Sequence, residues 1–116
     1  MPQDAFSMDD RPGTQPGQRV LTLHGPLTLT AVFGFQSTMR NDNSRALILD
    51  LTDMPYIDSA GIGAMVGAYV SNQKSGRTLS LVGVCERVRN AFKVTHVDDF
   101  FQYFDSVEAA EQATAA

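Results

Sequence analysis

The stretch that decides the fold is residues 46–63, which read ALILDLTDMPYIDSAGIG. Its first part, residues 46–51, is too short for a helix and apolar on both faces, so it predicts a central β-strand covered on both sides. A proline in residues 53–58 predicts a loop. Ser59 then opens a segment with helical spacing that ends at Lys74-Ser75-Gly76, where a basic residue is followed by glycine. This stretch therefore predicts a strand, a loop and a helix in succession.

The alternation of strand and helix continues on both sides of this stretch. The patterns predict strands at residues 20–24, 78–84 and 100–104, and helices at residues 28–40, at 86–95 and after a capping box at 105–108. In the helix at 28–40, Thr28 is placed to cap the first turn, and the apolar positions Leu29, Val32, Phe33 and Met39 recur at helical spacing. Short alternating elements indicate an α/β domain with a mixed five-stranded sheet and about four helices.

Residues 1–17 differ in composition from the rest of the chain. Prolines and glycines among polar residues predict a flexible N-terminal segment, in which only residues 5–8 favour a short edge strand. The folded domain is therefore expected at residues 18–116. With 116 residues, of which 43% are hydrophobic, the chain has material for one core and not for two.

Charge and cysteine usage limit the kinds of function. The net charge is −4, and the nine basic residues are scattered singly, so we expect no direct nucleic-acid partner. No apolar stretch is long enough for a membrane span, and the first residues lack the apolar core of a secretory signal. The single cysteine, Cys85, cannot form an internal disulfide. These features predict a protein of the cytoplasm.

The segment with the most chemical information is residues 58–63, Asp58-Ser59-Ala60-Gly61-Ile62-Gly63. It places a serine at a helix N-terminus, where unpaired backbone N–H groups and the helix dipole tolerate an added negative charge. A phosphate on Ser59, beside Asp58, would repel an acidic or apolar partner surface without unfolding the domain. The two glycines would let a partner loop approach the backbone. Alternatively, Ser59 is only a helix cap and the glycines serve close packing.

The same segment, with the strand before it and the helix after it, resembles the D-S-[SA]-G-[LI]-G signature of STAS domains, and the chain is similar to anti-sigma factor antagonists. The resemblance extends over residues 18–110. It implies that Ser59 is the phosphoacceptor, that Asp58 is the acidic residue beside it, and that residues 58–63 bind the partner. By the same resemblance, that partner is an anti-sigma factor that is also a serine kinase. In that family the unphosphorylated form binds the kinase and so frees a sigma factor, which is what we expect here.

Two positions depart from the family pattern. Many members carry acidic residues, G-E-x-D, in the turn after the early strand, where this chain has Gly25-Pro26-Leu27-Thr28. Ala60 stands where some relatives have a second serine, which leaves Ser59 as the only hydroxyl of the motif. The resemblance therefore implies a single phosphorylation site, without an acidic contribution from that turn.

Other functions find little support in the sequence. Ser59 lacks the G-x-S-x-G pattern of a hydrolase, and His24 and His96 carry no sign of a catalytic role. One cysteine and two distant histidines give no metal site, and no cofactor is expected. The main alternative is a STAS-fold subunit of a membrane-associated lipid or anion transport assembly, in which Ser59 is not phosphorylated. The oligomeric state stays open, a homo-oligomer included.

Overall fold

The computed structural model of the chain describes residues 5–116. Its elements, in chain order, are β1 (Ser7–Pro12), β2 (Gln18–His24), α1 (Val32–Asn41), β3 (Ala46–Asp53), α2 (Ser59–Lys74), β4 (Thr78–Val82), α3 (Glu86–Val94), the short 3₁₀ helix η1 (Asp98–Phe100), β5 (Gln102–Phe104) and α4 (Val107–Ala113).

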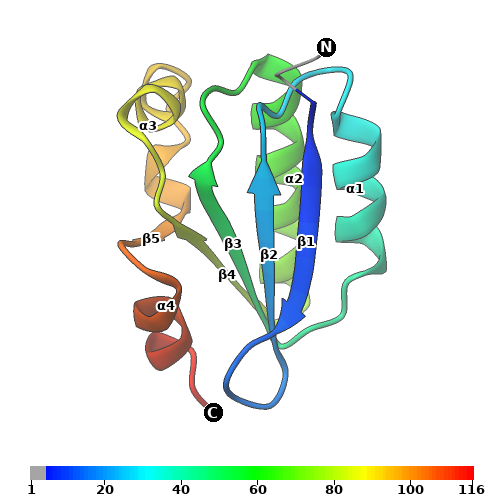
Figure 1. Ribbon diagram of the computed structural model, residues 1–116, viewed down its shortest axis with the longest axis vertical. Helices are drawn as coiled ribbons and strands as arrows, with labels where there is room; N and C mark the ends of the chain where they lie inside the picture. Colours follow the sequence, from blue (N-terminus) through cyan, green and yellow to red (C-terminus); the bar gives the residue numbers. More distant parts are fainter. Residues whose placement is uncertain (1–4) are drawn as a thin grey trace.

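The five strands form one sheet in the order β1-β2-β3-β4-β5. β1 pairs antiparallel with β2, and the other neighbours are parallel. Each parallel pair is joined through a helix, and Figure 1 shows α1 and α2 side by side behind the sheet, with α4 at the other side of it. The predicted α/β class, the mixed five-stranded sheet and the four helices are confirmed.

The central strand β3 is covered on both faces, as predicted. Leu47 and Leu49 belong to the large core beneath α1, α2 and α3, in which Phe35 and Phe92 are fully buried. Ile48 points the other way because side chains alternate along a strand. It packs in a second, smaller cluster of buried residues, which comprises Val20, Ile48, Val82 and Ala110. Helix α4 therefore closes the opposite face at its lower end.

The N-terminal segment contains a longer edge strand than the sequence suggests. β1 begins at Ser7 and ends at Pro12, whereas the predicted edge strand lay at residues 5–8. It pairs with β2 along its whole length, and Arg19 of β2 donates two hydrogen bonds to Asp10, at 3.0 and 2.6 Å. Pro12 is tolerated because it ends an edge strand. Residues 1–4 of the predicted flexible segment lie outside the described residues.

Helix α1 begins later than predicted. It starts at Val32 after Ala31, and the Thr28 hydroxyl contacts the Thr30 hydroxyl at 3.2 Å and does not cap the helix. The reason is tertiary, because Leu27 forms an isolated parallel bridge with Ile57 and is held in extended form beside the next loop. The chain can therefore coil only after it leaves that contact.

Candidate functional site

The site lies at the edge of the sheet where β2 and β3 end, since the carboxyl ends of parallel strands meet on one side. The loop after β2 and the loop after β3 are joined there by backbone hydrogen bonds. Leu27 N donates to Tyr56 O at 3.3 Å, and Asp58 N donates to Leu27 O at 3.2 Å. The beginning of α2 is thus fixed against a second segment of the chain, far away in sequence.

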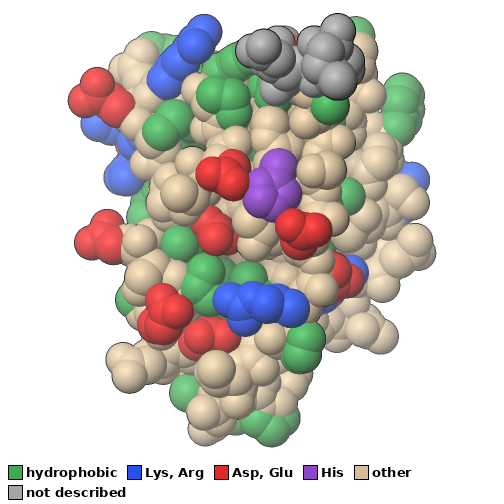
Figure 2. Space-filling model, in the orientation of Figure 1, with side chains coloured by type: hydrophobic (Ala, Val, Ile, Leu, Met, Phe, Trp, Pro, Cys, Tyr) green, Lys and Arg blue, Asp and Glu red, His purple; other side chains and the backbone are tan. Residues whose placement is uncertain are grey.

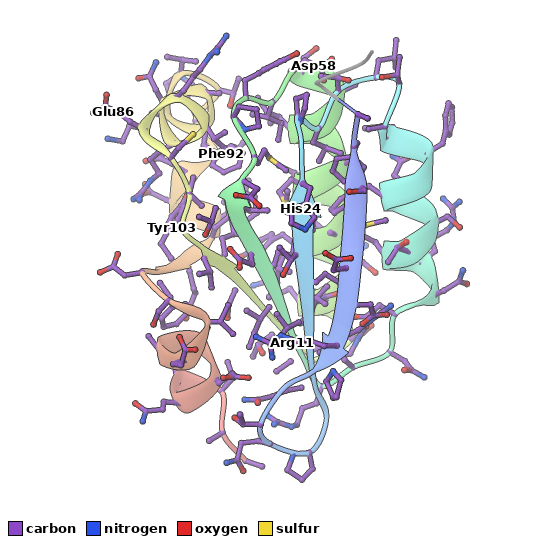
Figure 3. The ribbon with its side chains drawn as sticks, viewed as in Figure 1. Arg11, His24, Asp58, Glu86, Phe92 and Tyr103 are labelled. Carbon is purple, nitrogen blue, oxygen red and sulfur yellow. The ribbon has the colours of Figure 1, made fainter. Side chains whose placement is uncertain are left out.

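Asp58, which is labelled in Figure 3, fixes both segments with one side chain. Its Oδ1 accepts a hydrogen bond from Gly61 N at 2.9 Å, which makes Asp58 the N-cap of α2. Its Oδ2 accepts a second one from Leu29 N at 3.0 Å. The cap is therefore Asp58, and the alternative in which Ser59 caps the helix is wrong. Ser59 is the first residue within the helix.

Ser59 is exposed at this position. Among residues 5–116 its hydroxyl makes no hydrogen bond. The backbone N–H groups of Ser59 and Ala60 have no acceptor within the helix, because the first turn lacks the preceding carbonyls. These N–H groups and the helix dipole favour an anion beside Ser59. The site thus offers a reachable hydroxyl in surroundings that accept negative charge.

The two glycines of the motif have different surroundings. Gly61 is buried, and a Cβ atom there would clash with the carbonyl oxygen of Leu27 and lie 2.7 Å from Ile57 Cγ1. Gly63 is exposed, and a Cβ atom there would meet nothing within 4 Å. Gly61 therefore lets the domain's own two loops meet, and only Gly63 leaves open space for another molecule.

The remaining motif residues are half-buried. Ala60 and Ile62 pack against the large core, and Asp58 is partly exposed. The structure therefore brings residues 58–63 together on one turn, but it presents Ser59 and Gly63 to solvent and uses the others largely to hold the turn in place.

Two of the apolar side chains that recur at helical spacing in the predicted helix at residues 28–40 are exposed. Leu29 is 64% exposed and Phe33 is 75% exposed. Leu29 lies before α1 and is attached to Asp58, and Phe33 follows the buried Val32 in the first turn of the helix. Leu29 falls before the helix begins, and Phe33 lies on the solvent side of its first turn. Of the two, Leu29 lies next to the candidate site, through its hydrogen bond to Asp58.

A row of charged groups crosses the exposed face of the sheet, with His24 between two acidic side chains (Figure 2). His24 Nε2 lies 2.8 Å from Asp9 Oδ2, and His24 Nδ1 lies 2.8 Å from Asp53 Oδ2. Hydrogen bonds to Asp9 and then to Asp53 raise the pKa of His24 above its ordinary value. Both ring nitrogens are engaged by carboxylates, so His24 is arranged to join three strands and not to activate Ser59.

Other chemistry is not assembled in the part of the chain that the structure describes. His96 is exposed, and no cluster of three or more metal-ligating side chains occurs within residues 5–116. No helix in that range has the length and apolar character needed to cross a membrane.

The structure is thus a single α/β domain that presents an exposed serine at the start of a helix. The chain belongs to the STAS domain family, whose pattern it matches over residues 9–110. The family resemblance noted in the sequence is thereby confirmed.

Sequence relatives include the anti-sigma-B factor antagonist of Staphylococcus aureus strain NCTC 8325. It is 29% identical over 70 residues, which are 60% of this chain and 65% of that protein. The anti-sigma-B factor antagonist of Listeria monocytogenes is 36% identical over 56 residues, which are 48% of this chain and 49% of that protein. The chain thus spans between about half and two thirds of the length of these relatives.

Solved structures share the fold at low identity. An anti-sigma factor antagonist from Mycobacterium paratuberculosis has a TM-score of 0.79 at 17% identity, covering 96% of this chain and 95% of that one. The phosphorylated form of the Bacillus cell fate determinant SpoIIAA has a TM-score of 0.70 at 17% identity, covering 94% of this chain and 99% of that one. A sulfate transporter family protein from Wolinella succinogenes has a TM-score of 0.75 at 22% identity, covering 84% of each chain.

Proposed function

We propose that this protein is an anti-sigma factor antagonist that binds an anti-sigma serine kinase, releases a sigma factor, and is switched off by phosphorylation of Ser59. The observation that carries the proposal is the exposed Ser59 hydroxyl at the start of α2. The sequence relatives named as anti-sigma-B factor antagonists support the same role. So does the family motif, which supplies the serine and its acidic neighbour.

The modification itself suits the geometry. The Ser59 oxygen would form a bond to the γ-phosphorus of ATP as the bond to the β-phosphate oxygen breaks, and the hydroxyl proton would pass to a base of the kinase. ADP leaves, and the product carries nearly two negative charges. The unpaired N–H groups at the start of the helix offset part of this charge. The fold therefore tolerates the phosphate.

The contact with a partner would be affected much more strongly. Leu29 is hydrogen-bonded to Asp58, Gly63 lies one helical turn after Ser59, and Phe33 is exposed on the neighbouring helix α1. These residues offer open positions onto which a partner could pack. A phosphate on Ser59 would have to be desolvated in such a contact, and it would repel acidic groups. One covalent change thus converts a binding surface into a repelling one.

A phosphorylation assay tests the proposal. The full chain is incubated with candidate anti-sigma serine kinases and ATP, and mass spectrometry locates the phosphate. We expect modification of Ser59, its loss in Ser59→Ala, and no change in Ser71→Ala, a matched control because Ser71 is also exposed and lies in the same helix. Modification of the Ser59→Ala variant to the wild-type level would overturn the proposal.

Binding measurements separate the switch from the alternative in a transport assembly. Ser59→Ala should keep the chain in its kinase-binding form, and Ser59→Asp should weaken kinase binding at least about tenfold because it places a charge in the contact. A structural subunit without phosphorylation would tolerate both substitutions equally. Equal kinase affinity of the two variants would therefore count against the switch.

A further inference from the structure

Helix α3 carries an unusual concentration of positive charge for an acidic protein. Three basic side chains, Arg87, Arg89 and Lys93, stand within its nine residues, accompanied by one carboxylate, Glu86. Figure 2 shows blue side chains gathered at the upper left, where Figure 1 places α3. The three cations, with Val84, Glu86 and Asn90, line an open groove of about 650 Å³.

The cations of this groove differ from those of the sheet. Arg19 and Arg77 bind the buried carboxylate of Asp42, at 3.0 and 3.1 Å. Within residues 5–116, by contrast, Arg87, Arg89 and Lys93 form no ion pair. Their charge is thus not used to hold the described part of the fold together.

Two of the guanidinium groups are held in place by aromatic rings instead. The Arg89 guanidinium lies 3.6 Å from the centre of the Tyr103 ring, and its Nε is buried without an acceptor among the described residues. The Arg87 guanidinium lies 4.9 Å from the centre of the Tyr56 ring. Such stacking orients a guanidinium and leaves its edge N–H donors for a carboxylate. The groove therefore presents oriented donors, and Val94 beside them is 66% exposed.

The groove adjoins the candidate site. Tyr56, on which Arg87 stacks, belongs to the loop that leads into Ser59. Figure 3 shows Glu86 at the beginning of α3 and Asp58 at the beginning of α2 at the same end of the molecule. A protein that covers Ser59 could therefore reach the groove with a neighbouring segment.

We infer that the basic face of α3 is a docking surface for an acidic segment of the partner protein, an inference that rests on the proposed function for the identity of that partner. Carboxylate side chains of the segment would accept hydrogen bonds from Arg87 and Arg89 and pair with Lys93. The arrangement also explains the sign of the switch, because an acidic surface drawn to α3 is repelled by a phosphate on Ser59. Attraction and repulsion then act on the same partner.

The groove can be tested without the kinase, by titrating the isotope-labelled full chain with hexaglutamate and following amide shifts by NMR. We expect the amide shifts to be concentrated in α3 and around Tyr56. The affinity for hexaglutamate should fall as added salt shortens the Debye length from about 14 Å to about 6 Å. The variant Arg87→Gln/Lys93→Gln should bind at least about threefold more weakly, because exposed charge pairs contribute modestly.

The control variant is Arg40→Gln/Lys74→Gln, which removes the same two charge types from exposed positions in the last turns of α1 and α2. It should bind hexaglutamate like the wild type. Equal weakening in both variants, shifts spread over the whole surface, or no shifts would overturn the inference. Inorganic phosphate that shifted the same amides as strongly at equal charge would also overturn it, in favour of a small-anion site. None of these outcomes bears on phosphorylation of Ser59, which is measured separately.

Discussion

Replacing Gly61 and Gly63 with alanine, one at a time, should change the stability of the domain in opposite directions. In Gly61→Ala the new methyl group would lie 2.7 Å from Ile57 Cγ1 and 3.0 Å from the carbonyl carbon of Leu27. The oxygen of that carbonyl cannot withdraw freely, because it accepts the hydrogen bond from Asp58 N at 3.2 Å. In Gly63→Ala the methyl group points into open space.

The magnitudes follow from these surroundings. Overpacking at Gly61 costs about 1–3 kcal/mol, and the better helix propensity of alanine offsets up to about 1 kcal/mol of it. Gly63→Ala should gain up to about 1 kcal/mol from propensity alone. Because both variants gain the same helix propensity, they should differ by the overpacking cost of about 1–3 kcal/mol. At roughly 4 °C per kcal/mol for a domain of this size, their Tm values should differ by about 4–12 °C.

The measurement is thermal and urea unfolding followed by far-UV circular dichroism. Gly67→Ala provides the control, since Gly67 lies in the same helix and a Cβ atom there would also meet nothing within 4 Å. It should behave like Gly63→Ala. If Gly61→Ala proved as stable as these two variants, the argument that Gly61 permits the close approach of the two loops would be refuted.

Three further changes should have measurable effects. Asp42→Asn should lower the free energy of unfolding in urea by about 3 kcal/mol, because the Asp42 side chain is 1% exposed and neutralising it leaves Arg77 without a carboxylate and Arg19 with Asp10 alone; a loss under about 1 kcal/mol would contradict this. In His24→Gln the stability difference from the wild type should be full below about pH 6.5 and disappear as the pH rises through the raised pKa of folded His24, since only the protonated ring donates to both carboxylates. The exposed position limits that difference to about 1 kcal/mol, and a difference that grew with pH would contradict the assigned protonation. Phe33→Ser should leave the unfolding free energy within about 0.5 kcal/mol yet weaken binding of the partner kinase about tenfold, whereas unchanged affinity would place Phe33 outside the contact.

The sequence predicted those elements whose pattern is decided locally. The run at residues 46–51 allowed only a buried strand, and α2 ends at Lys74 as predicted, where Gly76 takes a positive φ of 70° that glycine adopts easily. Strand β1 was harder to predict, because its polar residues become a strand only by pairing with β2. Its order comes from partners elsewhere in the chain.

The sequence predicted those features of the candidate site that depend on neighbouring residues and missed those that depend on contacts with distant ones. The exposure of Ser59 followed from its place at a helix start, and the structure confirms it. Asp58 could have been predicted as the N-cap, because an aspartate just before a helix commonly accepts a hydrogen bond from a backbone N–H of the first turn, here that of Gly61. The exposure of Leu29 could not be predicted, because it depends on the contact between the two loops that delays the start of α1.

The boundary strand β1 has a consequence for self-association. It carries Asp9, Asp10 and Arg11 along one edge of the sheet and ends in Pro12, which has no N–H to donate. A second copy that paired with this edge would have to accommodate the charged side chains and would lack one N–H donor, and such edges discourage aggregation. Multimers of this chain should therefore not continue the sheet across β1.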